Sequence, residues 1–328
     1  MKVSVAMTTY NGEKYIIDQL QSILNQTRLP DEVIICDDCS LDDTPLLVKE
    51  FIDKNSLTNW KFIINKTNKG WRKNFIDTIA MTTGDIIFCA DQDDIWLNYK
   101  IEIMSRIMEQ NEQVKYLSGK MITVDKNGKE IDSRLSVGNQ STGEVVKISF
   151  SKKFNNINFR GCTICVKRDL ALKLVKLNFS RFGHDAQLCR LSNIFDGTYI
   201  IQLPVIRYRI HDNNTTGVSD FTINKNNGVI RMDNIKRNIE WLDAVIDNHD
   251  IYSSLNKKKI KILYKTRSFL YKRLHFLQTK NVIEYIKLLK YKNYYSNIMM
   301  YLGDFYYCFE NNKLLGKIMS NLVSRFKR

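Results

Sequence analysis

The chain has 328 residues, of which 44% are hydrophobic and 26% are charged. A chain of this length and composition buries a large core, so we expect one large folded domain with an appendage, and a disordered chain is excluded. No segment reaches the roughly 18 to 20 uncharged apolar residues that span a bilayer, so no transmembrane helix is predicted.

The net charge of +15 is spread unevenly along the chain. Residues 1–228 hold 30 Lys and Arg against 27 Asp and Glu, whereas residues 229–328 hold 20 against 8. This shift predicts a domain over residues 1–228, a boundary near Gly228 and a basic region over residues 229–328. An excess of positive charge in one region also predicts an anionic partner for it.

Short apolar strands alternate with helices through the first third of the chain. Strands are predicted at 3–7, 32–36, 60–65 and 85–90, and helices from the turn after the first strand to about Asn25, from Pro45, and over 71–81. This alternation is typical of an α/β fold with a mostly parallel, doubly wound sheet and helices on both faces. The polar segments that follow the strands should therefore meet at one edge of the sheet.

The remaining elements are less regular. Strands are expected at 161–166 and 200–210, a hairpin turn at 124–129, a polar and mobile loop at 138–142, and a helix from about 185 to Leu191. Beyond Gly228 the pattern is all-helical, with apolar residues on one helical stripe and lysines off it. The basic face is either solvated or a surface that docks on anionic lipid headgroups.

Three carboxylates stand in four positions at the end of the strand at 85–90, in the sequence Asp91-Gln92-Asp93-Asp94. Carboxylates this close repel one another unless a cation lies among them. Hard oxygen ligands of this kind suit Mg²⁺ or Mn²⁺. The alternative is an acidic turn that caps the next helix, a role that suits Asp94.

Four segments of the first hundred residues form a recurring set. They are Val5-Ala6-Met7-Thr8-Thr9-Tyr10-Asn11-Gly12, Asp37-Asp38-Cys39-Ser40-Leu41-Asp42-Asp43-Thr44, Asn68-Lys69-Gly70 and Asp91-Gln92-Asp93. Together they resemble the family 2 glycosyltransferases, which have the GT-A fold, and the resemblance covers roughly residues 1–220. The later segments around Gly183-His184-Asp185 and His211 resemble a rhamnosyltransferase-like branch of that family.

The resemblance implies a site for a nucleoside-diphosphate sugar. Asp38 would accept the N3–H of a uracil or thymine, Tyr10 would stack on that base, and Thr8 would offer a polar contact. Asp91 would lie near the ribose. The alternative for Asp38 is a simple turn former.

The resemblance also implies a divalent metal, Mg²⁺ or Mn²⁺, that neutralises the departing diphosphate. Asp93 is the expected metal ligand, and His211 would complete the shell or contact the diphosphate, unless it is an ordinary loop histidine. Lys69 and Lys73 are candidates for phosphate or sugar contacts, or are solvated lysines.

By the same resemblance Asp185 is the expected general base, and an in-line attack on the anomeric carbon would invert its configuration, as in this family. A carboxylate at this predicted helix start can instead cap the helix. Relatives in this branch often have aromatic residues after the His-Asp pair, whereas this chain has Ala186-Gln187-Leu188. That departure weakens any transfer of specificity for the sugar or the acceptor.

The expected function is transfer of a sugar from dTDP-rhamnose or a UDP-hexose to a lipid-linked or oligosaccharide acceptor in bacterial surface polysaccharide synthesis. The first residues enter a strand directly and the seven cysteines are an odd number, so a reducing cytoplasm and a peripheral location at the inner membrane face are expected. A homo-oligomer is left open.

The sequence also bears on other classes of function. The basic C-terminal region with its tyrosines is compatible with nucleic-acid binding or a membrane scaffold, although no specific nucleic acid is expected. A zinc site could use Cys36, Cys39, Cys162 and Cys165. Nucleotidyl transfer and dinucleotide binding are disfavoured, because the chain has no glycine-rich phosphate loop and no G-x-G-x-x-G.

Overall fold

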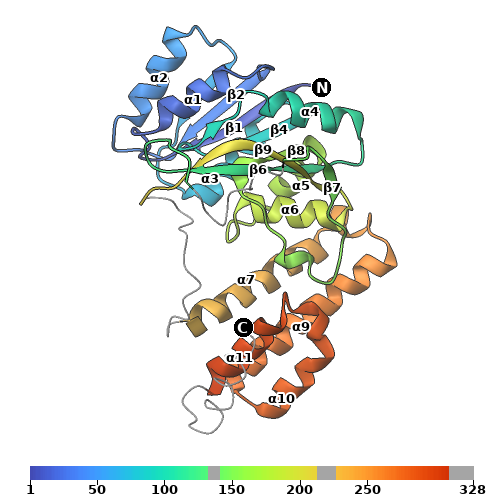
Figure 1. Cartoon of the computed structure of the whole chain (residues 1–328). Coiled ribbons are helices and arrows are strands. Elements are labelled where there is room, and N and C mark those ends of the chain that lie inside the picture. Colours follow the sequence, from blue (N-terminus) through green and yellow to red (C-terminus); the bar gives the residue numbers. More distant parts are fainter. Residues whose placement is uncertain (132–140, 213–226, 310–328) are drawn as a thin grey trace. The chain divides into compact units, whose positions relative to one another are not determined.

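The computed structural model describes residues 1–131, 141–212 and 227–309 (Figure 1). The chain divides into two compact units, one of residues 1–149 with 157–217 and one of residues 150–156 with 218–328. Each is described by itself. The loop expected at 138–142 falls largely outside the described residues, and the domain limits predicted from the charge remain a prediction.

The first half of the sheet is parallel, as predicted. Its order is β3-β2-β1-β4, and all three strand pairs are parallel. Every residue of β1, β2 and β4 is buried, which suits their Val and Ile content, because strands covered on both faces need no polar side. The strands are β1 (Val3–Thr9), β2 (Glu32–Asp37), β3 (Trp60–Ile64) and β4 (Ile86–Ala90).

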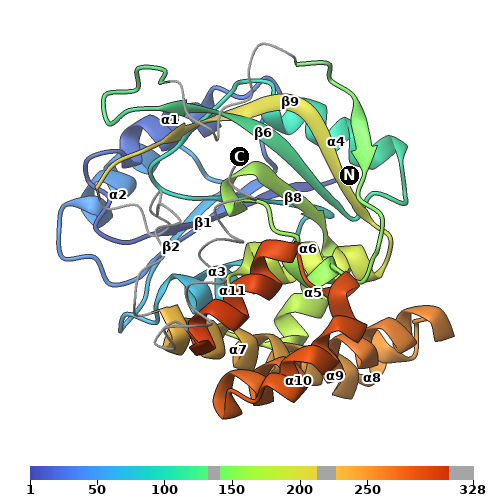
Figure 2. The same ribbon diagram turned by 60° about the horizontal axis from the view of Figure 1, so that its bottom comes forward.

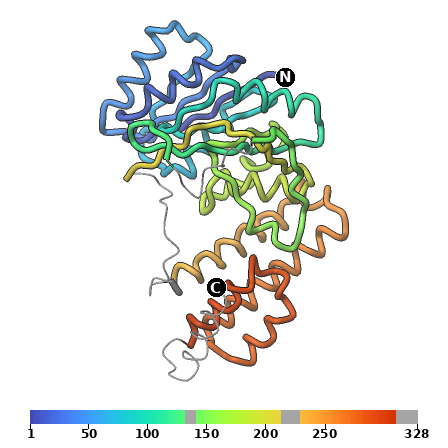
Figure 3. The backbone as a smooth tube through the Cα atoms, viewed as in Figure 1, coloured from blue at the N-terminus to red at the C-terminus, as the bar shows by residue number. Residues whose placement is uncertain are grey.

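The second half of the sheet is mixed. β8 (Ile164–Lys167) is antiparallel to both β4 and β6 (Tyr116–Val124), and β9 (Thr198–Arg209) is parallel to β6. The yellow strand β9 follows the green strand β6 along its length (Figure 3). Two short strands, β5 (Ile95–Trp96) and β7 (Val145–Lys147), pair antiparallel with β9. The sequence did not predict β5, β6 or β7, because they are short or carry no clear alternation.

Helices cover both faces of this sheet, as expected. One face carries α1 (Ile16–Leu24), α2 (Thr44–Lys54) and α4 (Lys100–Gln110), and the other carries α3, α5 and α6 (Figures 1 and 2). These are α3 (Trp71–Met81), α5 (Arg168–Leu177) and α6 (His184–Ile194). Pro45 lies in the first turn of α2, where its missing N–H costs no hydrogen bond.

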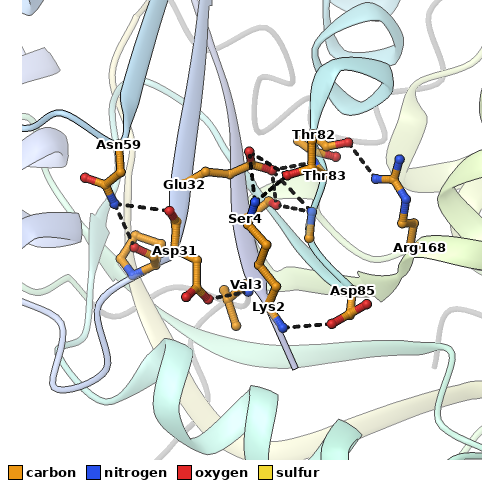
Figure 4. A network of polar contacts seen from close by, with 12 residues as sticks. Lys2, Val3, Ser4, Asp31, Glu32, Asn59, Thr82, Thr83, Asp85 and Arg168 are labelled. Carbon is orange, nitrogen blue, oxygen red and sulfur yellow. Dashed lines mark hydrogen bonds and ion pairs between the residues drawn. The ribbon is translucent and has the colours of Figure 1, made fainter.

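The edge of the sheet where the parallel strands begin is closed by hydrogen bonds. Figure 4 shows the Glu32 carboxylate between Ser4 and Thr83, and it accepts hydrogen bonds from Ser4 Oγ at 2.5 Å and from Thr83 Oγ1 at 2.9 Å. Nearby, Arg168 donates to the Thr82 carbonyl at 2.6 Å. Because these polar groups are satisfied by one another, this edge is structural, and the chemistry belongs to the opposite edge.

The C-terminal unit is helical throughout its described part, as predicted. Leu263, Leu270 and Leu277 of the expected stripe are buried in α9, and the aromatic residues Phe269 and Phe276 add to this core. Among the helices that the structure describes, none has the length and apolar character needed to cross a membrane. The helices are α7 (Asn227–Asp247), α8 (His249–Tyr252), α9 (Lys257–Thr279), α10 (Val282–Lys287), the 3₁₀ segment Leu288–Tyr294 and α11 (Ile298–Phe309).

A buried ionic cluster joins three helices of this unit. Asp304 in α11 is fully buried and pairs with Arg231 of α7 and Arg273 of α9, each at 2.6 Å. The Tyr295 hydroxyl donates to the same carboxylate at 3.1 Å. A buried carboxylate with this many donors holds α7, α9 and α11 together, and losing it would leave the buried Arg273 and the partly buried Arg231 without this counter-charge.

Candidate active site

The carboxyl ends of β1, β2 and β4 bring three polar loops together. The strand register sets Thr9 beside Asp37 and Met7 beside Ala90. The segments that follow these strands therefore start side by side, and they contain Tyr10, Asp38 and Asp91. The sequence predicted this gathering, because the carboxyl ends of parallel strands share one edge.

Asp38 is held rigidly in this edge. Only 2% of its surface is exposed, and its Oδ1 accepts hydrogen bonds from Asn65 Nδ2 at 3.0 Å and from the Lys69 backbone N at 2.8 Å. Asn65 in turn donates to Asn74 Oδ1 at 2.9 Å. Among the described residues no hydrogen bond reaches Asp38 Oδ2, so this oxygen is available to accept one from a ligand.

The loop after β1 is joined to the acidic segment by one side chain. Gln92 accepts a hydrogen bond from Tyr10 N at 2.7 Å and donates one to Tyr10 O at 2.9 Å. The Tyr10 ring is 45% exposed, as a stacking platform must be, whereas Thr8 is buried at 8%. Gly12 leaves room for Gln92, because a Cβ there would lie against Gln92 Oε1 and this side chain would have to move.

The acidic segment contains a carboxylate whose pKa is strongly displaced. Burial and the negative charges of Asp93, Asp94 and Asp185 hold the pKa of Asp91 well above its usual value. Asp185 lies on α6, far from Asp91 in the sequence, and the fold brings the two charges close enough to interact. Such a concentration of unneutralised negative charge is a cation-binding environment.

Asp94 lies beneath this cluster and is fully buried. Its Oδ1 accepts a hydrogen bond from the Arg209 backbone N at 3.1 Å, and the Cys162 thiol also interacts with this carboxylate. Burial and the charge of Asp93 raise the pKa of Asp94 to about 7. Asp94 therefore joins β9 to the acidic loop, and the expected cap on the following helix is not seen: α4 begins after Tyr99, without a side-chain cap.

The ligand atoms of Asp91, Asp94 and Cys162 lie within 4.8 Å of one another. Burial and the charges of Asp94 and Asp91 raise the pKa of the Cys162 thiol well above its usual value, so it stays protonated. A protonated thiol is a poor ligand for a hard cation, and the carboxylates are the better donors here.

Lys100 supplies a buried positive charge that the sequence analysis missed. Its Nζ donates to the Cys162 carbonyl at 2.6 Å and lies 3.6 Å from the centre of the Trp96 ring. Burial lowers the pKa of Lys100 to about 8, although the negative charge of Asp94 opposes this effect. A lysine on the apolar face of a predicted helix was the only signal in the sequence.

The two predicted metal ligands are neighbours. His211 Nε2 lies 2.8 Å from Asp93 Oδ2, and the His211 ring packs on Tyr15 with centroids 4.8 Å apart. Arg209 Nε donates to the Asp93 carbonyl at 3.0 Å, which adds a residue that the sequence analysis had not singled out. Proximity of an imidazole and a carboxylate is what a shared set of metal ligands requires.

Asp185 lies in the first turn of α6 and accepts a hydrogen bond from Ala186 N at 2.7 Å. Only glycine fits at position 183, because a Cβ there would lie 2.5 Å from Asp185 Oδ1 and 2.9 Å from the Trp71 ring. The preceding His184 is 2% exposed and stacks on Phe75 with centroids 3.8 Å apart. His184 thus anchors the start of α6, and it leaves Asp185 half-buried at the site.

The two lysines proposed to contact phosphate both pair with Asp77 of α3. Lys69 Nζ lies 3.1 Å from Asp77 Oδ2, and Lys73 Nζ bonds to Asp77 Oδ1. In the structure, Lys69 also donates its backbone N–H to Asp38. Their contact with a donor remains a prediction.

The two Cys-x-x-Cys pairs do not form a joint site. All seven cysteines are free, and none of the candidate metal-binding groups among the described residues contains both pairs. Cys36 lies within the buried strand β2, and burial raises the pKa of its thiol.

Comparison with known proteins agrees with this geometry. The sequence model of Glycosyl transferase family 2 matches residues 4–171, just over half of the chain. The chain is 27% identical to the dTDP-rhamnosyl transferase RfbG of Shigella flexneri over 280 residues, which are 80% of this chain and 92% of that protein. It is 32% identical to the EpsE protein of Bacillus subtilis (strain 168) over 127 residues, 39% of this chain and 45% of that one.

A third relative is the UDP-Glc:alpha-D-GlcNAc-diphosphoundecaprenol beta-1,3-glucosyltransferase WfgD of Escherichia coli. The identity is 29% over 168 residues, 51% of this chain and 61% of that protein. The chain spans less than two thirds of the length of WfgD and of EpsE.

Among solved structures, residues 1–349 of S. aureus TarS in complex with UDP-GlcNAc are similar with a TM-score of 0.58 and 21% identity, covering 94% of this chain and 81% of that one. This likeness bears on the fold alone. The matched family and the mixed sheet with helices on both faces agree with each other, and the chain belongs to the family 2 glycosyltransferases, transferase enzymes with the GT-A fold.

Proposed function

We propose that this protein is an inverting, metal-dependent glycosyltransferase that moves a sugar from a nucleoside-diphosphate donor to an acceptor hydroxyl. The donor is dTDP-rhamnose or a UDP-hexose. Similarity to RfbG over most of both chains supports the first, and similarity to WfgD and to TarS with bound UDP-GlcNAc supports the second.

Asp38 and Tyr10 would bind the base of the donor. Asp38 Oδ2 would accept the N3–H that uracil and thymine share, while Asn65 and Lys69 N hold the other oxygen. Tyr10 would stack on the base with its exposed ring. Thr8 and Asp91 line the same edge, and Lys69 and Lys73 would contact phosphate or sugar after leaving Asp77.

The residues present fit a divalent cation, Mg²⁺ or Mn²⁺. Asp93 and His211 would hold it, with Asp91 beside them. Burial and the neighbouring carboxylates that raise the pKa of Asp91 support a cation at this place. When bound, the cation would stabilise the negative charge that develops on the departing diphosphate.

Asp185 would act as the general base. Its carboxylate would take the proton of the acceptor hydroxyl as that oxygen bonds to the anomeric carbon, and the bond from this carbon to the diphosphate oxygen would break with its electron pair. Attack opposite the leaving group inverts the configuration. The N-cap of α6 is Gly183 and no side chain caps the helix, so the bond from Ala186 N to Asp185 Oδ1 would leave Oδ2 to take the proton.

The proposed acceptor is a lipid-linked or oligosaccharide intermediate of a bacterial surface polysaccharide, made at the cytoplasmic face of the membrane. Similarity to WfgD, whose name specifies a diphosphoundecaprenol acceptor, supports a lipid-linked substrate. The excess of basic residues in the C-terminal region supports contact with an anionic membrane surface.

The observation that carries the proposal is the 2.8 Å contact of His211 Nε2 with Asp93 Oδ2, at the sheet edge where Asn65 and Lys69 N hold Asp38. The test is the thermal shift produced by UDP, dTDP, GDP and ADP, each with and without Mn²⁺. We expect stabilisation by UDP or dTDP that depends on metal, loss of the metal effect in Asp93→Ala and loss of the nucleotide effect in Asp38→Asn. An absent response to every nucleotide would contradict the proposal.

A further inference from the structure

A short segment of the C-terminal unit exposes an unusual number of aliphatic side chains. The exposed fractions are 42% for Val282, 64% for Ile283, 56% for Ile286 and 49% for Leu289. Within the described residues, no other stretch of eight exposes more than two large apolar side chains. These four residues are called the α10 surface.

Helical spacing sets the α10 surface apart from the core. Val282, Ile286 and Leu289 follow one another at intervals of four and three residues, so they share a face, and Ile283 lies next to it. The other face is used for packing: Tyr285 is 8% exposed, and its ring contacts Phe276 and Tyr301 with centroid distances of 5.1 and 4.3 Å. Since Tyr285 and the buried Leu288 attach the segment to its unit, the α10 surface is not needed for that attachment.

Basic groups surround these aliphatic side chains. Lys280, Lys287, Lys290 and Lys292 are all exposed, and the one acidic residue between positions 280 and 292 is Glu284. A hydrogen bond from Lys287 lowers the pKa of Glu284, and the charges of Lys287, His275 and Lys272 lower it further. Lys272 and His275 therefore lie near the start of α10 and extend the positive field from α9.

We propose that the α10 surface docks on an anionic lipid bilayer, with its aliphatic side chains in the headgroup region and the flanking lysines on lipid phosphates. Aliphatic and cationic side chains together are what an interfacial helix requires. A nucleic acid would use the lysines but would leave the four aliphatic side chains in water. The inference rests on the proposed function for its choice of partner, because a lipid-linked acceptor lies in such a bilayer.

The experiment is sedimentation of the full chain with vesicles of phosphatidylcholine, with and without one third phosphatidylglycerol. We expect the unmodified protein to bind the anionic vesicles, and to bind them less at about 0.5 M salt, where charges are screened. The double variant Ile283→Glu/Ile286→Glu should lower the partition coefficient by at least about tenfold, because it places carboxylates against anionic lipid.

A matched control replaces two exposed aliphatic residues of the other unit by glutamate. Leu29→Glu/Leu46→Glu alters two aliphatic side chains that are 59% and 54% exposed in the other unit, with the same change in net charge. This control should bind as the unmodified protein does. A second variant, Lys290→Glu/Lys292→Glu, tests the cationic part and should lose at least about tenfold in binding at low salt. Circular dichroism melts confirm that each variant is folded.

Three results would overturn the assignment. The first is no binding of the unmodified protein to anionic vesicles at low salt, and the second is an equal loss of binding in the α10 variant and the control variant. The third is a change of oligomeric mass in Ile283→Glu/Ile286→Glu with vesicle binding intact. The last would make the surface an interface between two copies. Thermal shifts by nucleotide, measured without vesicles, should be unchanged in the α10 variant. Failure of those shifts in the unmodified protein would contradict the proposed function and leave the bilayer result standing.

Discussion

Gln92 and Tyr10 exchange two hydrogen bonds, at 2.7 and 2.9 Å, between the middle of the acidic segment and the backbone of the loop after β1. The proposed metal site and the proposed base-stacking residue are therefore mechanically joined. Displacement of one loop would displace the other. The pair gives Gln92 a positioning role, although the sequence pattern treats it as the variable residue between two carboxylates.

Gln92→Ala should weaken nucleotide binding by up to about 30-fold, because it removes two hydrogen bonds of about 1 kcal/mol each that position the loop. Titration calorimetry with UDP or dTDP in the presence of Mn²⁺ measures the change. Gln21→Ala is the matched control, since Gln21 is exposed and bonds to Asn25 on its own helix. Equal affinities in Gln92→Ala and Gln21→Ala would refute the positioning role.

Asp185→Asn should lower the rate of transfer by about 10² to 10⁴, the usual contribution of a general base. The asparagine oxygen can still accept the hydrogen bond from Ala186 N, so the start of α6 and the donor affinity should be preserved. Single-turnover assays and calorimetry separate the two effects. Full transfer by this variant would eliminate Asp185 as the base, whereas lost folding would point to capping alone.

His184 should make the protein less stable in mild acid. Burial lowers its pKa from 6.5 to about 4, so between these values the unfolded state binds a proton that the folded state does not. The free energy of unfolding therefore falls as the pH drops from 6.5 towards 4, by about 3 kcal/mol in total for this group. Urea titrations at several pH values measure the free energy of unfolding of the unmodified protein and of His184→Gln. The stability of the variant should fall less as the pH drops from 6.5 towards 4. An equal fall in both proteins would contradict the prediction.

Asp304→Asn should destabilise the C-terminal unit by about 3 to 5 kcal/mol, because the buried Arg273 would lose its counter-charge and the partly buried Arg231 would lose the same partner. Denaturant unfolding measures the loss. Asp233→Asn serves as the control, since Asp233 pairs with Arg237 within one helix, and its side chain is 46% exposed. A change of under 1 kcal/mol in Asp304→Asn would mean that the arginines find other partners.

The sequence by itself determined the elements and their order. Apolar runs and turn residues are local signals, so β1 to β4 and α3 match their predicted ranges closely. The loops with Tyr10, Asp38 and Asp91 meet because the carboxyl ends of parallel strands share one edge of the sheet. The short strand β5 escaped prediction, because Ile95 and Trp96 acquire their pairing only from β9.

The tertiary structure alone decided which distant groups share the site. Asp185 raises the pKa of Asp91, Lys100 bonds to the Cys162 carbonyl, and Arg209 holds Asp93, across long separations in the chain. Such pairings depend on how helices and strands pack, and no periodicity in the sequence encodes the distance between them. The exposure of Ile283 and Ile286 is also a tertiary result, since a helical pattern does not say which apolar residues the core will leave uncovered.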